Sequence, residues 1–207
     1  MILNSFYVKG QKQLVEGVII YNVTIKSSGP AVNTAEYNGT YTITVKGKQM
    51  RKEMKMSNGY DDVVVYDNNT NTVFSLKIVS GKKYAIQLDN DDYMNKIKKF
   101  EGYTLNEENE ETKKIAGFNA HKATVKYSDG TSTDIYYTPE WTPANKWMIE
   151  HFPQIKYLPL SFAYNENEMV MHFKADKIEI IPVESSLFRI PADYKVISYY
   201  EYRQMNK

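Results

Sequence analysis

Apolar and polar residues alternate along most of this chain with a period of two. Between residues 18 and 26, for example, Ile19, Tyr21, Val23 and Ile25 fall on one face of an extended chain. Such alternation is typical of half-buried β-strands. The predicted strands span residues 18–26, 40–46, 48–56, 60–66, 73–79, 84–88, 120–127, 131–138, 158–164, 168–174, 177–181 and 187–190.

Short polar segments between these strands predict tight connections. Residues 80–81 and 128–130 end in glycine, which adopts positive φ without steric cost, and residues 165–167 form a third candidate turn. The acidic residues 107–111 are interpreted as a solvated loop. About a dozen strands with short connections predict a mainly β domain built as an antiparallel meander, sandwich or barrel.

Three short helices are expected to interrupt the strands. Asn90 is a candidate cap for the first helix, and Thr142 followed by Pro143 predicts the start of the second. Ser198, with Glu201 three residues later, forms a capping box for a helix near the C-terminus.

Composition narrows the class of protein. The chain has 207 residues, of which 42% are hydrophobic and 25% charged, as expected of one globular β-rich domain spanning residues 1–207. Its 26 basic and 25 acidic residues leave a net charge of +1, which gives no broad field to attract nucleic acid. Without cysteine the chain can form neither disulfides nor thiolate sites.

Contact with a membrane is expected to be peripheral at most. The chain has no run of 18 apolar residues that could span a bilayer. The first residues, MILNSFYVKG, lack the basic and long apolar regions of a signal segment, so we expect none in the chain as given.

The sequence contains few residue patterns that are typical of a catalytic site. The three histidines, His121, His151 and His172, have no HxH or HExxH spacing, so neither a metal nor a cofactor is expected. The chain has no GxSxG elbow and no glycine-rich phosphate loop. We therefore expect a binding protein rather than an enzyme.

Residues 139–160 form an unusually long connection between two predicted strands. They hold both tryptophans of the chain, and such insertions are often lids over a pocket for an apolar ligand. The simpler interpretation is that the segment is core that covers one face of a curved sheet. The candidate ligand-binding residues are Trp141, Trp147, Met148, Phe152 and Tyr157 in this segment, with Met50 and Met54 on the methionine face of strand 48–56.

Tyrosine is the most abundant aromatic residue, with 18 copies against 8 phenylalanines. Tyrosine suits a half-exposed sheet surface, because its ring packs while its hydroxyl stays hydrated. A second interpretation is a platform on which a ligand or partner stacks.

The second half of the chain resembles a known family. Residues 111–140 (ETKKIAGFNAHKATVKYSDGTSTDIYYTPE) are similar to a segment of LolA-like and GLPGLI-related cell-envelope proteins of Bacteroidetes type. The matching positions are Ile115, Gly117, Phe118, Lys122, Ala123, Tyr137, Thr138, Pro139 and Glu140. YLPLSF (157–162) and FRIPADYKV (188–196) resemble later segments of that group, although the GLPGLI string and a cysteine near residues 119–121 are missing.

This resemblance implies a periplasmic protein or an outer-membrane-associated lipoprotein. It implies a curved, open half-barrel whose concave face is covered by two or three short helices and holds a lipid or another apolar small molecule. The alternative hypothesis is a structural or interaction protein that binds a protein or glycan through its tyrosine-rich sheet surface. The residues alone leave both hypotheses open.

Overall fold

The computed structural model describes residues 11–27, 36–67, 69–89, 93, 98–128, 130–166 and 168–205. Most of these residues lie in one sheet of twelve strands in the order β14-β7-β6-β5-β4-β3-β2-β13-β12-β10-β9-β8. Its strands are β2 (Glu16–Ser27), β3 (Glu36–Lys46), β4 (Gln49–Met56), β5 (Asp61–Asp67), β6 (Thr72–Val79), β7 (Lys82–Leu88), β8 (Thr104–Ile115), β9 (Phe118–Lys126), β10 (Ser132–Thr138), β12 (Leu158–Glu166), β13 (Met169–Glu179) and β14 (Lys195–Ser198). A small second sheet pairs β1 (Lys12–Leu14) with β11 (Trp141–Pro143).

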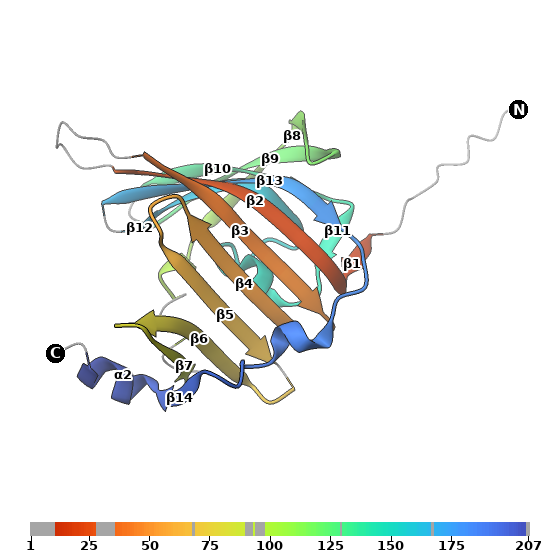
Figure 1. Ribbon diagram of the computed structural model, residues 1–207. Helices are drawn as coiled ribbons and strands as arrows, with labels where there is room; N and C mark the ends of the chain where they lie inside the picture. The colour runs from red at the N-terminus through yellow and green to blue at the C-terminus, as the bar shows by residue number, and fades with distance from the viewer. Residues whose placement is uncertain are drawn as a thin grey trace, which may run out of the picture.

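The large sheet curves strongly and stays open, because its outermost strands β14 and β8 do not pair with each other (Figure 1). The alternation read from the sequence determines which side chains face inward. Along β2, Ile19, Tyr21 and Val23 are buried on the concave face, whereas Asn22 is exposed on the outer face. The prediction of a mainly β half-barrel is therefore confirmed at the level of strand content and open shape.

The sheet is mixed rather than wholly antiparallel, which corrects the prediction. β14 runs parallel to β7, with Val196 beside Ala85 and Ile197 beside Ile86. Parallel pairing joins segments that are distant in sequence, so no hairpin signal marks it. The predicted strand 187–190 is also wrong, because a 3-10 helix, η3 (Ser185–Phe188), occupies this region.

The helices whose bounds are described are one α-helix, α2 (Tyr199–Met205), and three 3-10 helices, η1 (Lys98–Phe100), η2 (Lys146–Ile149) and η3. Tyr93 is also helical, but the residues on either side of it lie outside the described part of the chain. The helix start predicted at Thr142 is wrong, since Thr142 lies in β11 and Asn145 caps η2. Asn90, the other predicted cap, lies outside the described residues.

The capping box at Ser198 is confirmed. The Ser198 amide donates to Glu201 Oε2 at 2.7 Å, and the Glu201 amide donates to Ser198 Oγ at 3.1 Å. These reciprocal bonds satisfy amide groups that the first turn of α2 leaves free.

The acidic residues 107–111 belong to β8 and not to a loop, which is a further correction. β8 is an edge strand, and its pairing with β9 shifts register between Glu108 and Thr112. A strand that is solvated on both faces needs no apolar alternation, so the sequence pattern does not reveal it.

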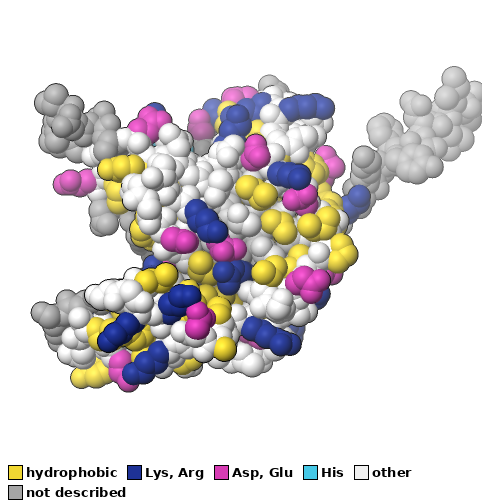
Figure 2. Space-filling model, in the orientation of Figure 1, with side chains coloured by type: hydrophobic (Ala, Val, Ile, Leu, Met, Phe, Trp, Pro, Cys, Tyr) yellow, Lys and Arg dark blue, Asp and Glu magenta, His cyan; other side chains and the backbone are white. Residues whose placement is uncertain are grey.

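The segment after β13 crosses the outer face of the sheet (Figure 1). Val183 and Phe188 pack there against Val65, Leu76 and Ala85, forming a small second core. Lys46 donates to the Val183 carbonyl at 2.5 Å and so fixes the crossing point. Over the upper part of β2 and β3, by contrast, few charged or hydrophobic side chains reach the surface (Figure 2).

Candidate functional site

The concave face of the sheet is apolar over most of its width. Inward side chains from many of the strands form one continuous hydrophobic cluster, and aromatic rings occupy its middle. Phe162 stacks on Phe173 with ring centroids 4.8 Å apart, and Tyr21 meets Phe162 edge to face at 5.7 Å. Such a face must be covered by protein or by an apolar ligand.

Residues 139–157, the covering segment, lie over this face. The segment contains β11 and the single 3-10 turn of η2, and its other backbone bonds within the segment are isolated turns. Asn145 Oδ1 accepts from the Trp147 amide at 2.9 Å, which fixes the start of η2. At the far end, the Gln154 amide donates to the Tyr103 hydroxyl at 3.0 Å.

Four of the seven predicted ligand-binding residues meet in the core beneath this segment. Trp147, Met148 and Phe152 are buried, and Met50 on β4 is fully buried in the same cluster. Met54 is half-buried and packs against that cluster. These residues therefore line the space between the covering segment and the sheet.

The other two predicted residues lie at the margins of the segment. Trp141 is half-buried in β11, with Lys12 Nζ 5.6 Å from its ring centroid. Tyr157 stacks on Tyr137 of β10 with centroids 5.1 Å apart and an interplanar angle of 8°. Neither ring enters the centre of the concave face, so the prediction that they bind ligand remains a prediction.

An ion pair that the sequence pattern did not predict joins the covering segment to the sheet. Lys52 on β4 contacts Glu150 with Nζ and Oε1 2.6 Å apart, and both side chains are almost completely buried. The Tyr66 hydroxyl lies 3.5 Å from Glu150 Oε2 and 2.5 Å from the Tyr93 hydroxyl. The sequence did contain one indication of this pair. Lys52 lies on the same strand face as Met50 and Met54, and a charge that points into the core requires a buried partner.

Burial shifts the titration of these groups. Removal from water lowers the pKa of Lys52, and the neighbouring Glu150 carboxylate only partly offsets the effect. Burial also raises the pKa values of Tyr66 and Tyr41 well above that of a free tyrosine. The Lys52–Glu150 ion pair thus holds the covering segment against the sheet within surroundings that are otherwise apolar.

Eight of the seventeen tyrosines that the structure describes are buried. Three of the described tyrosines are more than a third exposed: Tyr37, Tyr60 and Tyr200. They lie in β3, just before β5 and in α2, and so on separate elements. The buried tyrosines are Tyr21, Tyr41, Tyr66, Tyr84, Tyr93, Tyr103, Tyr137 and Tyr164. This distribution favours an aromatic interior over the tyrosine-rich outer surface of the alternative hypothesis.

Neither a metal cluster nor a membrane-spanning helix is found in the described part of the chain. No three of its His, Asp and Glu side chains gather closely enough to hold a metal ion. No helix within it combines the length and apolar character needed to cross a bilayer.

No family model and no curated protein sequence matches the chain. Among solved structures, an uncharacterized conserved protein from Thermus thermophilus is similar, with a TM-score of 0.50 and 12% identity over 86% of this chain and 90% of that chain. A LolA superfamily protein from Nitrosomonas europaea gives a TM-score of 0.39 and 9% identity over 87% and 92% of the two chains. MucB gives 0.44 and 12% identity, over 88% of this chain and 60% of its own.

At these identities the similarity concerns the fold. The structural neighbours include a LolA superfamily protein.

Proposed function

We propose that this protein is a non-enzymatic binding protein of the cell envelope that takes an apolar ligand, such as a lipid acyl chain, into the concave face of its half-barrel. The proposal rests on one observation, which is that the apolar concave face is covered by a single, mostly irregular segment. A continuous apolar surface lies under a segment with one turn of 3-10 helix instead of a second layer of sheet.

Displacement of the covering segment would expose an acyl-binding surface. Phe152 would leave its contact with Phe162, Trp147 would leave its contact with Tyr66, and an acyl chain would take their place. Each methylene group buried contributes about 0.8 kcal/mol, so a long chain can offset the contacts that the segment loses. The ligand in this proposal competes with the covering segment for one surface.

Placement in the envelope rests on the sequence. The segment 111–140 and the later segments 157–162 and 188–196 follow one another in the order that LolA-like proteins show. Location in the periplasm or at the outer membrane is part of the same proposal.

The two tryptophans allow a direct test. In the variant Trp141→Phe, Trp147 is the one remaining tryptophan and reports on the concave face. Stearate carrying a doxyl group in mid-chain should quench Trp147 fluorescence with saturation, because the nitroxide would lie near the displaced ring. The reverse variant, Trp147→Phe, keeps Trp141 at the margin and should show weaker quenching.

Native mass spectrometry of the unmodified protein provides the second measurement. Acyl ligands should be retained, and a ligand at a hundred times its dissociation constant should stabilise the fold by about 2.7 kcal/mol. Equal quenching of the two single-tryptophan variants, with no bound lipid and no thermal shift, would overturn the proposal.

A further inference from the structure

The sheet is split on one side of the half-barrel, between β10 and β12. These strands pair through Tyr136 with Ser161, Tyr137 with Pro159 and Thr138 with Leu158, and the register shifts after Tyr136. Beyond that point β10 continues alongside β9, and β12 alongside β13. A side chain spans the split, since Thr133 Oγ1 donates to the Ala163 carbonyl at 3.3 Å.

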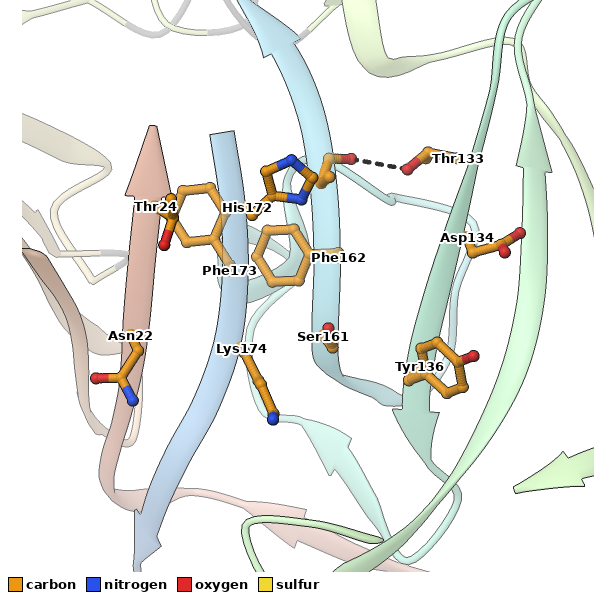
Figure 3. A pocket seen from close by; sticks show the side chains of 11 residues that line it. Asn22, Thr24, Thr133, Asp134, Tyr136, Ser161, Phe162, His172, Phe173 and Lys174 are labelled. Carbon is orange, nitrogen blue, oxygen red and sulfur yellow. Dashed lines mark hydrogen bonds between the residues drawn. The ribbon is translucent and has the colours of Figure 1, made fainter. Parts of the chain in front are cut away.

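A hollow of about 510 Å³ lies at this split (Figure 3). Its lining includes Ser161, Ala163 and His172, which face outward, and also Phe162 and Phe173, which face inward. Phe162 and Phe173 belong both to the lining of the hollow and to the hydrophobic core. These two residues therefore connect the hollow with the aromatic rings of the core.

The inner end of the hollow meets the surface assigned to the ligand above. Phe162 contacts Phe152 of the covering segment edge to face, with centroids 5.3 Å apart. His151 of the same segment stacks on Tyr164 at 4.1 Å, beside Phe173. An apolar chain that entered through the split would thus reach the rings that the covering segment occupies.

The outer rim of the hollow is polar and carries charges of both signs. Asp134 shares Lys122 with Glu111, since Lys122 Nζ lies 3.3 Å from each carboxylate, and Thr124 donates to Asp134 at 2.8 Å. Lys174 is exposed at the rim and forms no ion pair among the described residues. Asn22 lines the opposite side, with its amide bonded to Asp176 at 3.4 Å.

A second lysine lies close to this rim. Lys113 Nζ is 3.2 Å from the ring centroid of Tyr136, which lines the hollow. Its pKa is lowered first by burial and then by the positive charge of Lys174. The carboxylates of Glu111 and Asp134 raise the same pKa and so act against these two effects.

We infer that the split between β10 and β12 is a lateral entry for an amphiphile with an anionic head group, a carboxylate or a phosphate ester. The head group binds at Lys174 on the outer rim while the acyl chain passes Ala163 towards Phe162 and Phe152. The inference rests on the proposed function for the chain and adds the route of entry and the charge of the head group.

The first test fills the split. Ala163→Phe places a large side chain in the hollow and should weaken dodecanoate binding at least tenfold in calorimetry. Thr42→Phe, on the outer face of β3 and away from the hollow, is the matched control and should bind as the unmodified protein does. Circular dichroism melting of both variants shows whether they are folded.

The second test addresses the head group. Lys174→Ala should weaken dodecanoate and dodecyl phosphate binding by about threefold at low salt, in the range of an exposed charge pair. Dodecyl maltoside, which is neutral, should be unaffected. Lys55→Ala, an exposed lysine on the outer face of β4, is the matched control. Inorganic phosphate alone should bind too weakly to detect, because it lacks the chain.

The two proposals fail in different ways. If doxyl-stearate quenches Trp147 equally with and without Ala163→Phe, and Lys174→Ala changes nothing, the lateral entry is wrong while the acyl-binding function stands. If no amphiphile binds the unmodified protein, the proposed function fails and the entry fails with it.

Discussion

Glycine at position 39 shows how one residue limits the spacing of two strands. A Cβ atom built there would lie 2.2 Å from the Lys55 carbonyl oxygen and 2.5 Å from the Met56 sulfur. The closest atom belongs to the backbone of the neighbouring strand β4, so it cannot move aside without shifting that strand. Any larger residue would separate β3 from β4 where the core is continuous.

We therefore expect Gly39→Ala to destabilise the protein by about 1–3 kcal/mol, the range of overpacked sites. Urea unfolding followed by circular dichroism measures the loss. Gly47→Asn is the control, because Gly47 has φ +57° with no atom within 4 Å of the added Cβ, and asparagine tolerates that conformation. If both variants unfold at the same urea concentration, the close approach at Gly39 has no energetic importance.

At the level of elements, the Lys52–Glu150 pair is the strongest polar link between the covering segment and the sheet. Removing one partner leaves a buried charge unpaired, whereas replacing both with apolar residues of similar size does not. The pair consequently makes the position of the segment specific without adding much net stability.

We expect Glu150→Gln to cost about 3–5 kcal/mol, less any relief gained if Lys52 loses its proton. The double variant Lys52→Met with Glu150→Leu should recover most of that loss in thermal unfolding. Lys26→Met, which breaks the exposed pair with Glu36, should cost under about 1 kcal/mol. A Glu150→Gln loss no larger than this control would show that the pair does not hold the segment.

Elements with a local signal were predictable from the sequence, and elements defined by distant partners were not. The capping box needs only Ser198 and Glu201, and the alternation in β2 reports burial directly. β14 depends on a partner about a hundred residues earlier, and β8 carries an acidic stretch in place of an apolar face. The same holds for the candidate site, in which one part has a local sequence signal and the other does not.

The covering segment was recognisable from its tryptophans, but the hollow was not. Its lining comes from β2, β10, β12 and β13, and it exists because of one register shift after Tyr136. No spacing in a single strand encodes such a shift.

At the level of the whole molecule, the aromatic interior predicts sensitivity to alkali. Burial raises the pKa of Tyr103 to about 12, and it raises the pKa values of Tyr21, Tyr41 and Tyr66 as well. In the unfolded chain tyrosines ionise near pH 10. Above that pH the unfolded state binds fewer protons than the native state, so the free energy of unfolding falls as pH rises.

We expect a cooperative unfolding transition between about pH 10 and pH 12. Absorbance at 295 nm should show the exposed tyrosines ionising first and the buried set ionising together with the loss of circular dichroism. The lowered pKa values of Lys52 and Lys113 act in the opposite direction, but only below the pH at which an unfolded lysine loses its proton. Gradual ionisation of all tyrosines without unfolding would contradict the described burial.

The pairing of β2 with β13 also has a consequence for how the chain reaches this structure. Residues 18–27 of the first long strand find their partner only at residues 169–179, near the end of the chain. Until then one edge of β2 has no neighbour, and the two flanks of the half-barrel cannot join. A pairing of such long range slows folding, because the loop must close before the contacts form. During synthesis strand β2 therefore lacks this partner until almost the whole chain has been made.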